Sequence, residues 1–197
     1  GHAVTLLAVV GDDLPGDHLI KQLALSGVDT HAILKTPTFP TGSYMGTLSM
    51  HGELKYALDD MRIMSQLSSE YLRQNEDMFK QASVVFVDAN LSKKTLRTAL
   101  SLARKAKIPI CADPAAVSLS ERLLPFLPRF SLITPNIAEA SVLSGLQISP
   151  ANRQMALKAA KYFVGQGIQI AIISMAQFGV CYATSETSGH KIGRAHV

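Results

Sequence analysis

The chain has 197 residues and is 47% hydrophobic, 17% charged and 6% aromatic, with a formal net charge of +4. This composition is typical of a globular chain that forms one domain or a large part of one, and it excludes a disordered chain. No apolar run reaches the roughly 18 residues that span a bilayer, and the basic residues never form a run. We therefore expect a soluble, cytoplasmic protein, unless an organellar targeting segment precedes it, with neither membrane nor nucleic-acid partners.

The first 26 residues predict a strand followed by a helix. Residues 4–10 (VTLLAVV) are a continuous apolar run of strand length, and Gly11 ends it. In the helix expected over residues 15–26, apolar side chains share one stripe: Leu19, Ile20, Leu23 and Ala24.

Three short segments then predict a small antiparallel insertion over about residues 29–60. Residues 30–36, 42–50 and 54–60 alternate imperfectly between apolar and polar side chains. The letters PTG separate the first two segments, and HGE between the last two is typical of a hairpin turn. Short helices are expected next, over residues 62–82.

From residue 83 onward, strands alternate with helical patterns. The expected strands are apolar runs at residues 83–90, 108–114, 129–136 and 169–174. Ser92 is expected to cap one helix, and Ser149, followed by Pro150, another over residues 149–165. This alternation predicts an α/β fold with a mostly parallel sheet and helices covering both of its faces.

In sheets of this class, ligands bind outside the carboxyl ends of the strands. Polar side chains stand at those ends here: Asp12 and Asp13, Asp88 and Asn90, Asp113, Asn136 with Glu139, and Ser174. Each of them alone is ordinary turn or cap chemistry. Their repetition at five successive strand ends indicates a binding site along a single rim.

The pair Asn136 and Glu139 has two interpretations. Asn136 can cap the following helix, with Glu139 at the third helical position reaching back to the Asn136 amide in a capping box. The same position also aims both side chains at the rim, where a carboxylate can help to hold a hydrated Mg²⁺ beside phosphates. The two roles are compatible, and the spacing alone leaves both open.

The cysteines and the last residues carry no site. Cys111 and Cys181 lie in apolar runs without metal-ligand spacing, so we interpret both as small core residues. The final letters IGRAHV are what a common sequencing-adapter sequence encodes, so we expect residues 192–197 to be a non-native tail. Residues 1–191 are then the part to be assigned to a fold.

Residues 9–30 (VVGDDLPGDHLIKQLALSGVDT) and 133–145 (ITPNIAEASVLSG) carry two motifs, GDDxxG and TPNxxEAxxLxG. With these motifs the chain resembles the ribokinase/PfkB family of sugar and nucleoside kinases over about residues 1–184. The segments TGSYMGTLSMHGELKYALDDM, VVFVDANLS, ADP and LLPFLPRFSLITPNIAEA are most similar to its pseudouridine kinase branch. The resemblance implies a ribokinase-like domain, incomplete here, with a β-lid.

The resemblance also implies a reaction, in which ATP with Mg²⁺ phosphorylates the 5′-hydroxyl of pseudouridine or a related ribosyl substrate. The residues implied on the substrate side are Asp12, Asp13, Thr41, Gly42, Ser43, Tyr44, Asp60 and Asn90. On the nucleotide side they are Asn136, Ser174 and Gly179, with Glu139 directed to the metal. A homodimer through the lid is implied as well. The alternatives are a ribokinase- or adenosine-kinase-like enzyme and a non-catalytic binding module on the same fold.

The sequence departs from the family pattern in three places. The letters SMAQFG stand where the family has TLGxxG, so Ala176 replaces a glycine. The family's early GG motif is absent, and so is DTxGAGD, which supplies the catalytic base and the anion hole of the family. We therefore assign no catalytic residue and expect the chain by itself to be inactive.

Overall fold

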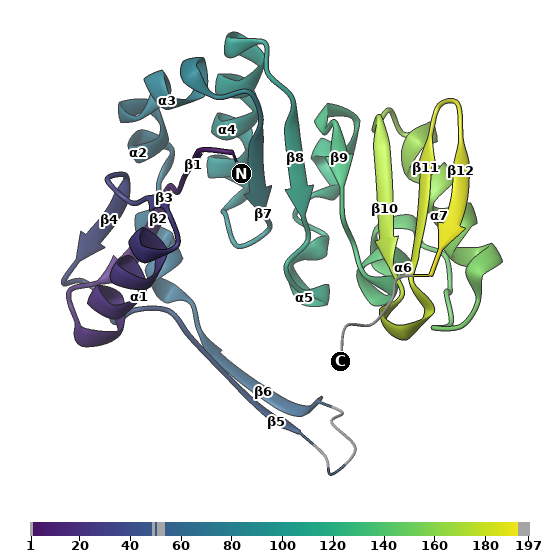
Figure 1. Cartoon of the computed structure of the whole chain (residues 1–197), viewed down its shortest axis with the longest axis horizontal. Helices are drawn as coiled ribbons and strands as arrows, with labels where there is room; N and C mark the ends of the chain where they lie inside the picture. Colours follow the sequence, from purple (N-terminus) through teal and green to yellow (C-terminus); the bar gives the residue numbers. More distant parts are fainter. Residues whose placement is uncertain (1, 49, 51–53, 193–197) are drawn as a thin grey trace. The chain divides into compact units, whose positions relative to one another are not determined.

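The structure is a computed structural model that describes residues 2–48, 50 and 54–192. The chain divides into two compact units, residues 1–75 and 76–197, each with its own sheets (Figure 1). Within the described ranges, no helix combines the length and the apolar character needed to cross a membrane.

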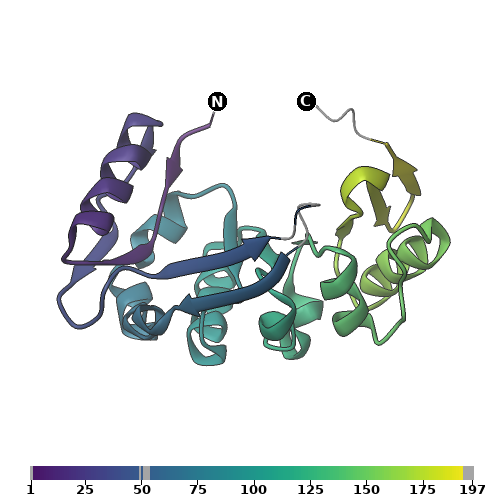
Figure 2. The ribbon, with the colours of Figure 1, turned by 90° about the horizontal axis from the view of Figure 1, so that it is seen from below.

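The first unit consists of short strands, a longer helix and two short helical segments. Its elements are β1 (Val4–Thr5), β2 (Ala8–Gly11), α1 (Leu14–Leu25), β3 (Val28–Asp29), β4 (Ile33–Thr36), β5 (Ser43–Leu48), β6 (Leu54–Asp60), η1 (Arg62–Gln66) and α2 (Ser69–Gln74). Strand β1 pairs in parallel with β3, and β2 in parallel with β4. Strands β5 and β6 pair antiparallel and form a two-stranded ribbon that extends from the rest of the unit (Figure 2).

Two expectations for this unit are wrong in detail. The apolar run 4–10 is not one strand, because it is split into β1 and β2, which pair with different partners. The antiparallel insertion is confirmed for β5 and β6, whereas residues 33–36 form β4, parallel to β2. A strand that follows a crossover helix returns in the direction of the strand before it, which explains the parallel pairing. The HGE turn lies outside the described residues.

The second unit contains one six-stranded sheet. Its elements are α3 (Glu76–Gln81), β7 (Val85–Asp88), α4 (Lys93–Ala106), β8 (Ile110–Asp113), α5 (Val117–Ser120), η2 (Leu124–Arg129), β9 (Leu132–Ile133), α6 (Ile137–Ser144), α7 (Arg153–Gly165), β10 (Ile170–Ser174), η3 (Ala176–Phe178), β11 (Val180–Thr184) and β12 (Ser188–Lys191). The strand order is β12-β11-β10-β9-β8-β7. Strands β7 to β10 are parallel to one another, β11 is antiparallel to β10, and β12 is antiparallel to β11, which confirms a mostly parallel sheet.

The two faces of this sheet differ in burial. In register across the strands, one face presents a row of residues that are at most 9% exposed: Val87, Ala112, Ile133, Ala171 and Ala183. On the other face Phe86 is 66% exposed and Ile170 40%. The expectation of helical cover on both faces is therefore wrong for the described part of this unit.

The helix caps of the second unit follow local sequence. The Ser92 hydroxyl accepts the Thr95 N–H at 3.1 Å, which confirms the predicted start of α4. The start predicted for α7 at Ser149 is wrong: the helix begins at Arg153, because the Asn152 side chain accepts the Met155 N–H at 3.0 Å. Ser and Asn are both good N-cap residues, and here the cap is Asn152, which directly precedes the first helical residue.

Candidate functional site

The carboxyl ends of β7, β8, β9 and β10 share one edge of the sheet in the second unit, because these strands are parallel and adjacent. Asp88 stands opposite Asp113 in the register of β7 and β8. Asn136, just beyond β9, forms a bridge with Ser174 at the end of β10. The predicted rim is thus confirmed for four of its five strand ends, and the end at Asp12 and Asp13, which lies in the first unit, stays a prediction.

Asp113 is fixed at the middle of this edge. The Thr134 hydroxyl donates to its Oδ2 at 2.8 Å, and the Ala115 N–H donates to its Oδ1 at 2.8 Å. Ala115 takes a left-handed conformation, with φ of +62°. The sequence placed Asp113 at a strand end but gave it no role, and its contact with Thr134 crosses from β8 to the end of β9.

Asn136 and Glu139 form the predicted capping box at the start of α6. The Glu139 N–H donates to Asn136 Oδ1 at 3.0 Å, and the Asn136 N–H donates to Glu139 Oε2 at 2.8 Å. A side-chain hydrogen bond between Asn136 and Glu139 also acts on the pKa of Glu139, so the two side chains engage each other as well as the backbone. A carboxylate accepts several hydrogen bonds and a carboxamide has two N–H donors, which leaves capacity for a ligand. The cap therefore exists, and it does not exclude the second role.

Glu139 is an unusual carboxylate because it is only 5% exposed. Burial raises its pKa, and the negative charge of Asp113 raises it further. Within the described ranges, neither carboxylate has a Lys, Arg or His partner, and no three His, Cys, Asp or Glu side chains are grouped to hold a metal. A pair of carboxylates without a counter-ion fits Mg²⁺, which proteins hold through one or two carboxylates together with phosphate and water.

Asn90 follows β7 in a turn whose backbone is held from two sides. Its N–H donates to Asp88 Oδ1 at 2.8 Å. Arg122 Nη1 donates to the carbonyls of Ala89 at 3.0 Å and Asn90 at 3.2 Å. Among the residues that the structure describes, the half-buried Asn90 carboxamide has no hydrogen-bond partner, so it is available to a ligand. Sequence reasoning missed Arg122, since a contact over 32 residues leaves no local signal.

The turn after Ser174 contains Gly179, predicted on the nucleotide side, and Ala176, which replaces a family glycine. Gly179 has φ of +86°, and a Cβ there would lie 2.0 Å from the Lys191 carbonyl oxygen in β12. Its own carbonyl accepts the Met175 N–H at 2.8 Å, which closes the turn. Ala176 has φ of +48°, so it keeps a glycine-like conformation although it has a side chain.

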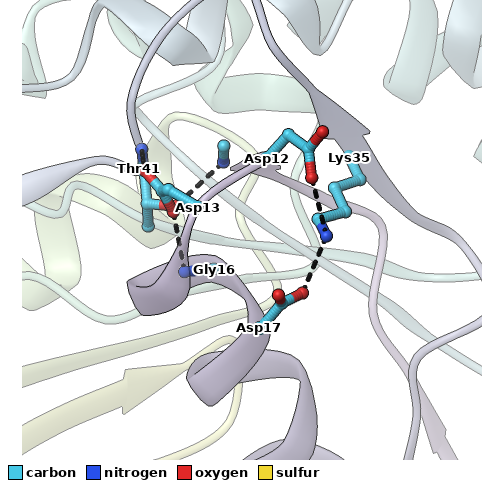
Figure 3. Close-up of polar contacts among 7 residues, drawn as sticks. Asp12, Asp13, Gly16, Asp17, Lys35 and Thr41 are labelled. Atoms are coloured by element: carbon cyan, nitrogen blue, oxygen red, sulfur yellow. Dashed lines mark hydrogen bonds and ion pairs between the residues drawn. The ribbon is translucent and has the colours of Figure 1, made fainter.

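In the first unit, the predicted aspartates lie in two separate polar contacts at the start of α1 (Figure 3). Both oxygens of Asp13 accept hydrogen bonds from Thr41, whose hydroxyl group is the main cause of a lowered pKa of Asp13. Asp12 pairs instead with Lys35 at 2.8 Å, and Asp17 pairs with the same ammonium at 2.8 Å. These pairings raise the pKa of Lys35 and keep it charged.

The remaining predicted substrate residues lie at the root of the β5–β6 hairpin. Ser43 pairs with Asp60 in the antiparallel register. The Arg62 guanidinium donates to both oxygens of Asp60, at 2.9 and 2.6 Å, and lowers the pKa of that carboxyl to about 2. Gly42 is half-buried, and Tyr44 is 65% exposed. Asp60 is thus engaged with its neighbour Arg62, while the Tyr44 side chain is free to meet a ligand.

Comparison with known proteins points to one family. The family model described as pfkB family carbohydrate kinase matches residues 1–195. The chain is 33% identical over 189 residues to a pseudouridine kinase of Escherichia coli strain K12, covering 96% of this chain and 58% of that protein. It is 28% identical over 181 residues to a ribokinase of Haemophilus influenzae, covering 91% and 57%.

Solved structures share the fold. A protein assigned as ribokinase II of E. coli, in complex with ATP and Mg²⁺, superposes with a TM-score of 0.81 at 20% identity, over 100% of this chain and 64% of that one. A carbohydrate kinase from Agrobacterium tumefaciens gives 0.80 at 21% identity, over 95% and 58%. The chain spans less than two thirds of the length of each of these relatives. The fold is ribokinase-like, and the match over residues 1–195 shows that the chain belongs to the pfkB family of carbohydrate kinases.

Proposed function

We propose that the chain is the nucleoside- and nucleotide-binding part of a cytoplasmic, ATP-dependent kinase that phosphorylates the 5′-hydroxyl of pseudouridine or a related ribosyl substrate. The observation that carries the proposal is the row of polar groups along the carboxyl edge of the second unit, with two carboxylates that have no counter-ion among the described residues. The relative named pseudouridine kinase supports the choice of substrate.

The second unit supplies the nucleotide side. Asn136, Ser174 and Gly179 bind the nucleotide, and Glu139 with Asp113 holds Mg²⁺. When bound, the metal neutralises charge on the phosphates. Binding it also makes the ionised form of Glu139 favourable, which burial otherwise opposes.

Each unit has its own set of proposed substrate residues. Asn90 offers its unpaired carboxamide to the nucleoside. In the first unit Gly42, Ser43 and Tyr44 contribute to substrate binding, with Thr41, Asp12, Asp13 and Asp60 supporting them. The exposed hairpin side chains Met45, Tyr56 and Leu58, each at least 71% exposed, form the apolar face of a homodimer through the lid.

The test of the nucleotide site is calorimetry of the chain with Mg²⁺ and the non-hydrolysable ATP analogue AMP-PNP. Glu139→Gln should weaken Mg²⁺-dependent binding at least about tenfold, because a neutral amide replaces a charged ligand. The matched control Glu186→Gln changes an exposed glutamate in the β11–β12 turn and should bind as the wild type does. Absence of binding, or equal affinity of Glu139→Gln and the wild type, contradicts the proposal.

The substrate is tested by titrating pseudouridine, uridine, ribose and adenosine. Pseudouridine should bind most tightly, whereas preference for ribose or adenosine favours the alternative enzyme of the same class. We expect no phosphate transfer, since the sequence lacks DTxGAGD, and measurable transfer to pseudouridine refutes that expectation. A genomic reading frame that continues into GAGD beyond Gly189 favours the kinase, and a natural stop near residue 191 favours a binding module.

A further inference from the structure

The β5–β6 hairpin is joined to its unit through Thr41, two residues before β5. The Thr41 N–H donates to Asp13 Oδ2 at 2.8 Å, and the Thr41 hydroxyl donates to Asp13 Oδ1 at 2.5 Å. The same hydroxyl oxygen accepts the Gly11 N–H at 2.9 Å, and Asp13 Oδ1 also accepts the Gly16 N–H at 2.9 Å. Asp13 and Thr41 together therefore link the end of β2, the cap of α1 and the root of the hairpin (Figure 3).

The two glycines of this motif are explained by the same contact. A Cβ at Gly11 would lie 2.5 Å from the Thr41 nitrogen, and a Cβ at Gly16 would lie 2.9 Å from the Thr41 hydroxyl oxygen and 2.4 Å from the Gly11 carbonyl oxygen. Neither glycine has a positive φ. Space for the approaching chain, not backbone freedom, therefore requires glycine at both positions.

The hydrogen bonds of Asp13 indicate a structural role and not direct contact with a ligand. A hydroxyl group has one proton, and Thr41 donates it to Asp13, so the Thr41 side chain has none to give to a substrate. The neighbouring Asp12 has no contact with Thr41 among the described residues, because it faces Lys35 on β4. The Asp13 carboxylate thus binds the root of the hairpin, whereas the Asp12 carboxylate binds β4.

We propose that Asp13 and Thr41 are positioning residues whose hydrogen bonds anchor the root of the β5–β6 hairpin. Gly11 and Gly16 leave room for Thr41 because they have no Cβ. The consequence for substrate binding rests on the proposed function: the anchor sets where Ser43 and Tyr44 are presented. The anchor itself is a property of the first unit and is tested without a ligand.

The test is hydrogen–deuterium exchange of the β5 and β6 amides in the chain. Asp13→Asn keeps an oxygen to cap α1, because Asn caps as well as Asp, but it turns an amide donor toward the Thr41 N–H. Exchange of the hairpin amides should become about three- to tenfold faster, the effect of one hydrogen bond, while the α1 amides stay as in the wild type. Thr41→Val should act in the same way, and Thr41→Ser, which keeps the hydroxyl, should restore wild-type exchange.

The matched control is Asp12→Asn, which removes the charge that pairs with Lys35 and should leave hairpin exchange unchanged. Unchanged hairpin exchange in Asp13→Asn and Thr41→Val overturns the proposal, and so does an equal acceleration in Asp12→Asn. Calorimetry with pseudouridine gives the second readout, in which Thr41→Val should weaken binding and Thr41→Ser should not. If the wild type binds no nucleoside or sugar, the proposed function fails, while the exchange data still decide the anchor.

Discussion

Ala176 offers the sharpest test of the local structure, because a side chain occupies a position with φ of +48°. Replacing it in Ala176→Gly removes the Cβ and leaves the rest of the η3 turn unchanged. The left-handed conformation costs an L-residue about 1–2 kcal/mol. The substitution relieves this cost. It also destabilises the folded state by about 0.4–1 kcal/mol, because glycine has more conformational freedom in the unfolded chain. The net expectation is a stabilisation of the second unit by about 0.5–1 kcal/mol.

The assay is urea denaturation followed through the NMR signals of β10 and β11, so that the transition of the second unit is observed directly. With an m-value of about 2 kcal/mol/M, the midpoint should rise by roughly 0.2–0.5 M. Ala115→Gly is a second instance, since Ala115 has φ of +62° in the loop after β8. Ala151→Gly is the matched control: Ala151 is exposed and has an ordinary negative φ, so its replacement should lower the midpoint. If Ala176→Gly lowers the midpoint as the control does, the assigned strain is refuted.

Three further outcomes are expected in the second unit. Gly179→Ala should cost at least about 2 kcal/mol of unfolding free energy, measured with urea, because its Cβ would collide with the backbone of β12; a loss under half of that contradicts the contact. Because burial raises the pKa of Glu139, its contribution to stability is present below the ordinary pKa of a carboxyl group and is lost as pH rises through the raised value. Glu139→Gln should therefore raise the urea midpoint at pH 7 and leave it nearly unchanged at pH 4; a fall at pH 7 argues against this sign. Arg122→Ala should cost about 1–3 kcal/mol and weaken nucleoside binding, with Arg122→Lys between it and the wild type; equal behaviour of both variants and the wild type excludes a positioning role for Arg122 toward Asn90.

Local spacing predicted the features that depend on neighbours in sequence. The capping box of Asn136 and Glu139 was readable because both partners lie within one helical turn. Ser92 was readable as a cap for the same reason. The rim followed from a rule about parallel strands, and it needed only the order of strands and helices.

Features that depend on distant partners were not readable. Alternation identified residues 33–36 as a strand but not the direction of its pairing, which is decided by β2. Strand β12 has the sequence SGHK without an apolar period, and only its pairing with β11 makes it a strand. Arg122 and the contact between Asp13 and Thr41 join segments 32 and 28 residues apart, so spacing gave no sign of either.

Two alanines in the buried row of the second sheet limit how β10, β11 and α7 can change. Ala171 and Ala183 lie in this row, and α7, which packs on β10 and β11, presents Ala156, Ala159 and Ala160, all 0% exposed. Methyl groups on both sides let the helix backbone lie close to the strands, and they leave no flexible side chain to yield to a larger neighbour. In β10 and β11, larger side chains can be accommodated on the face away from α7, whereas Ala171 and Ala183 must stay small, so we expect divergence in these two strands at alternate positions.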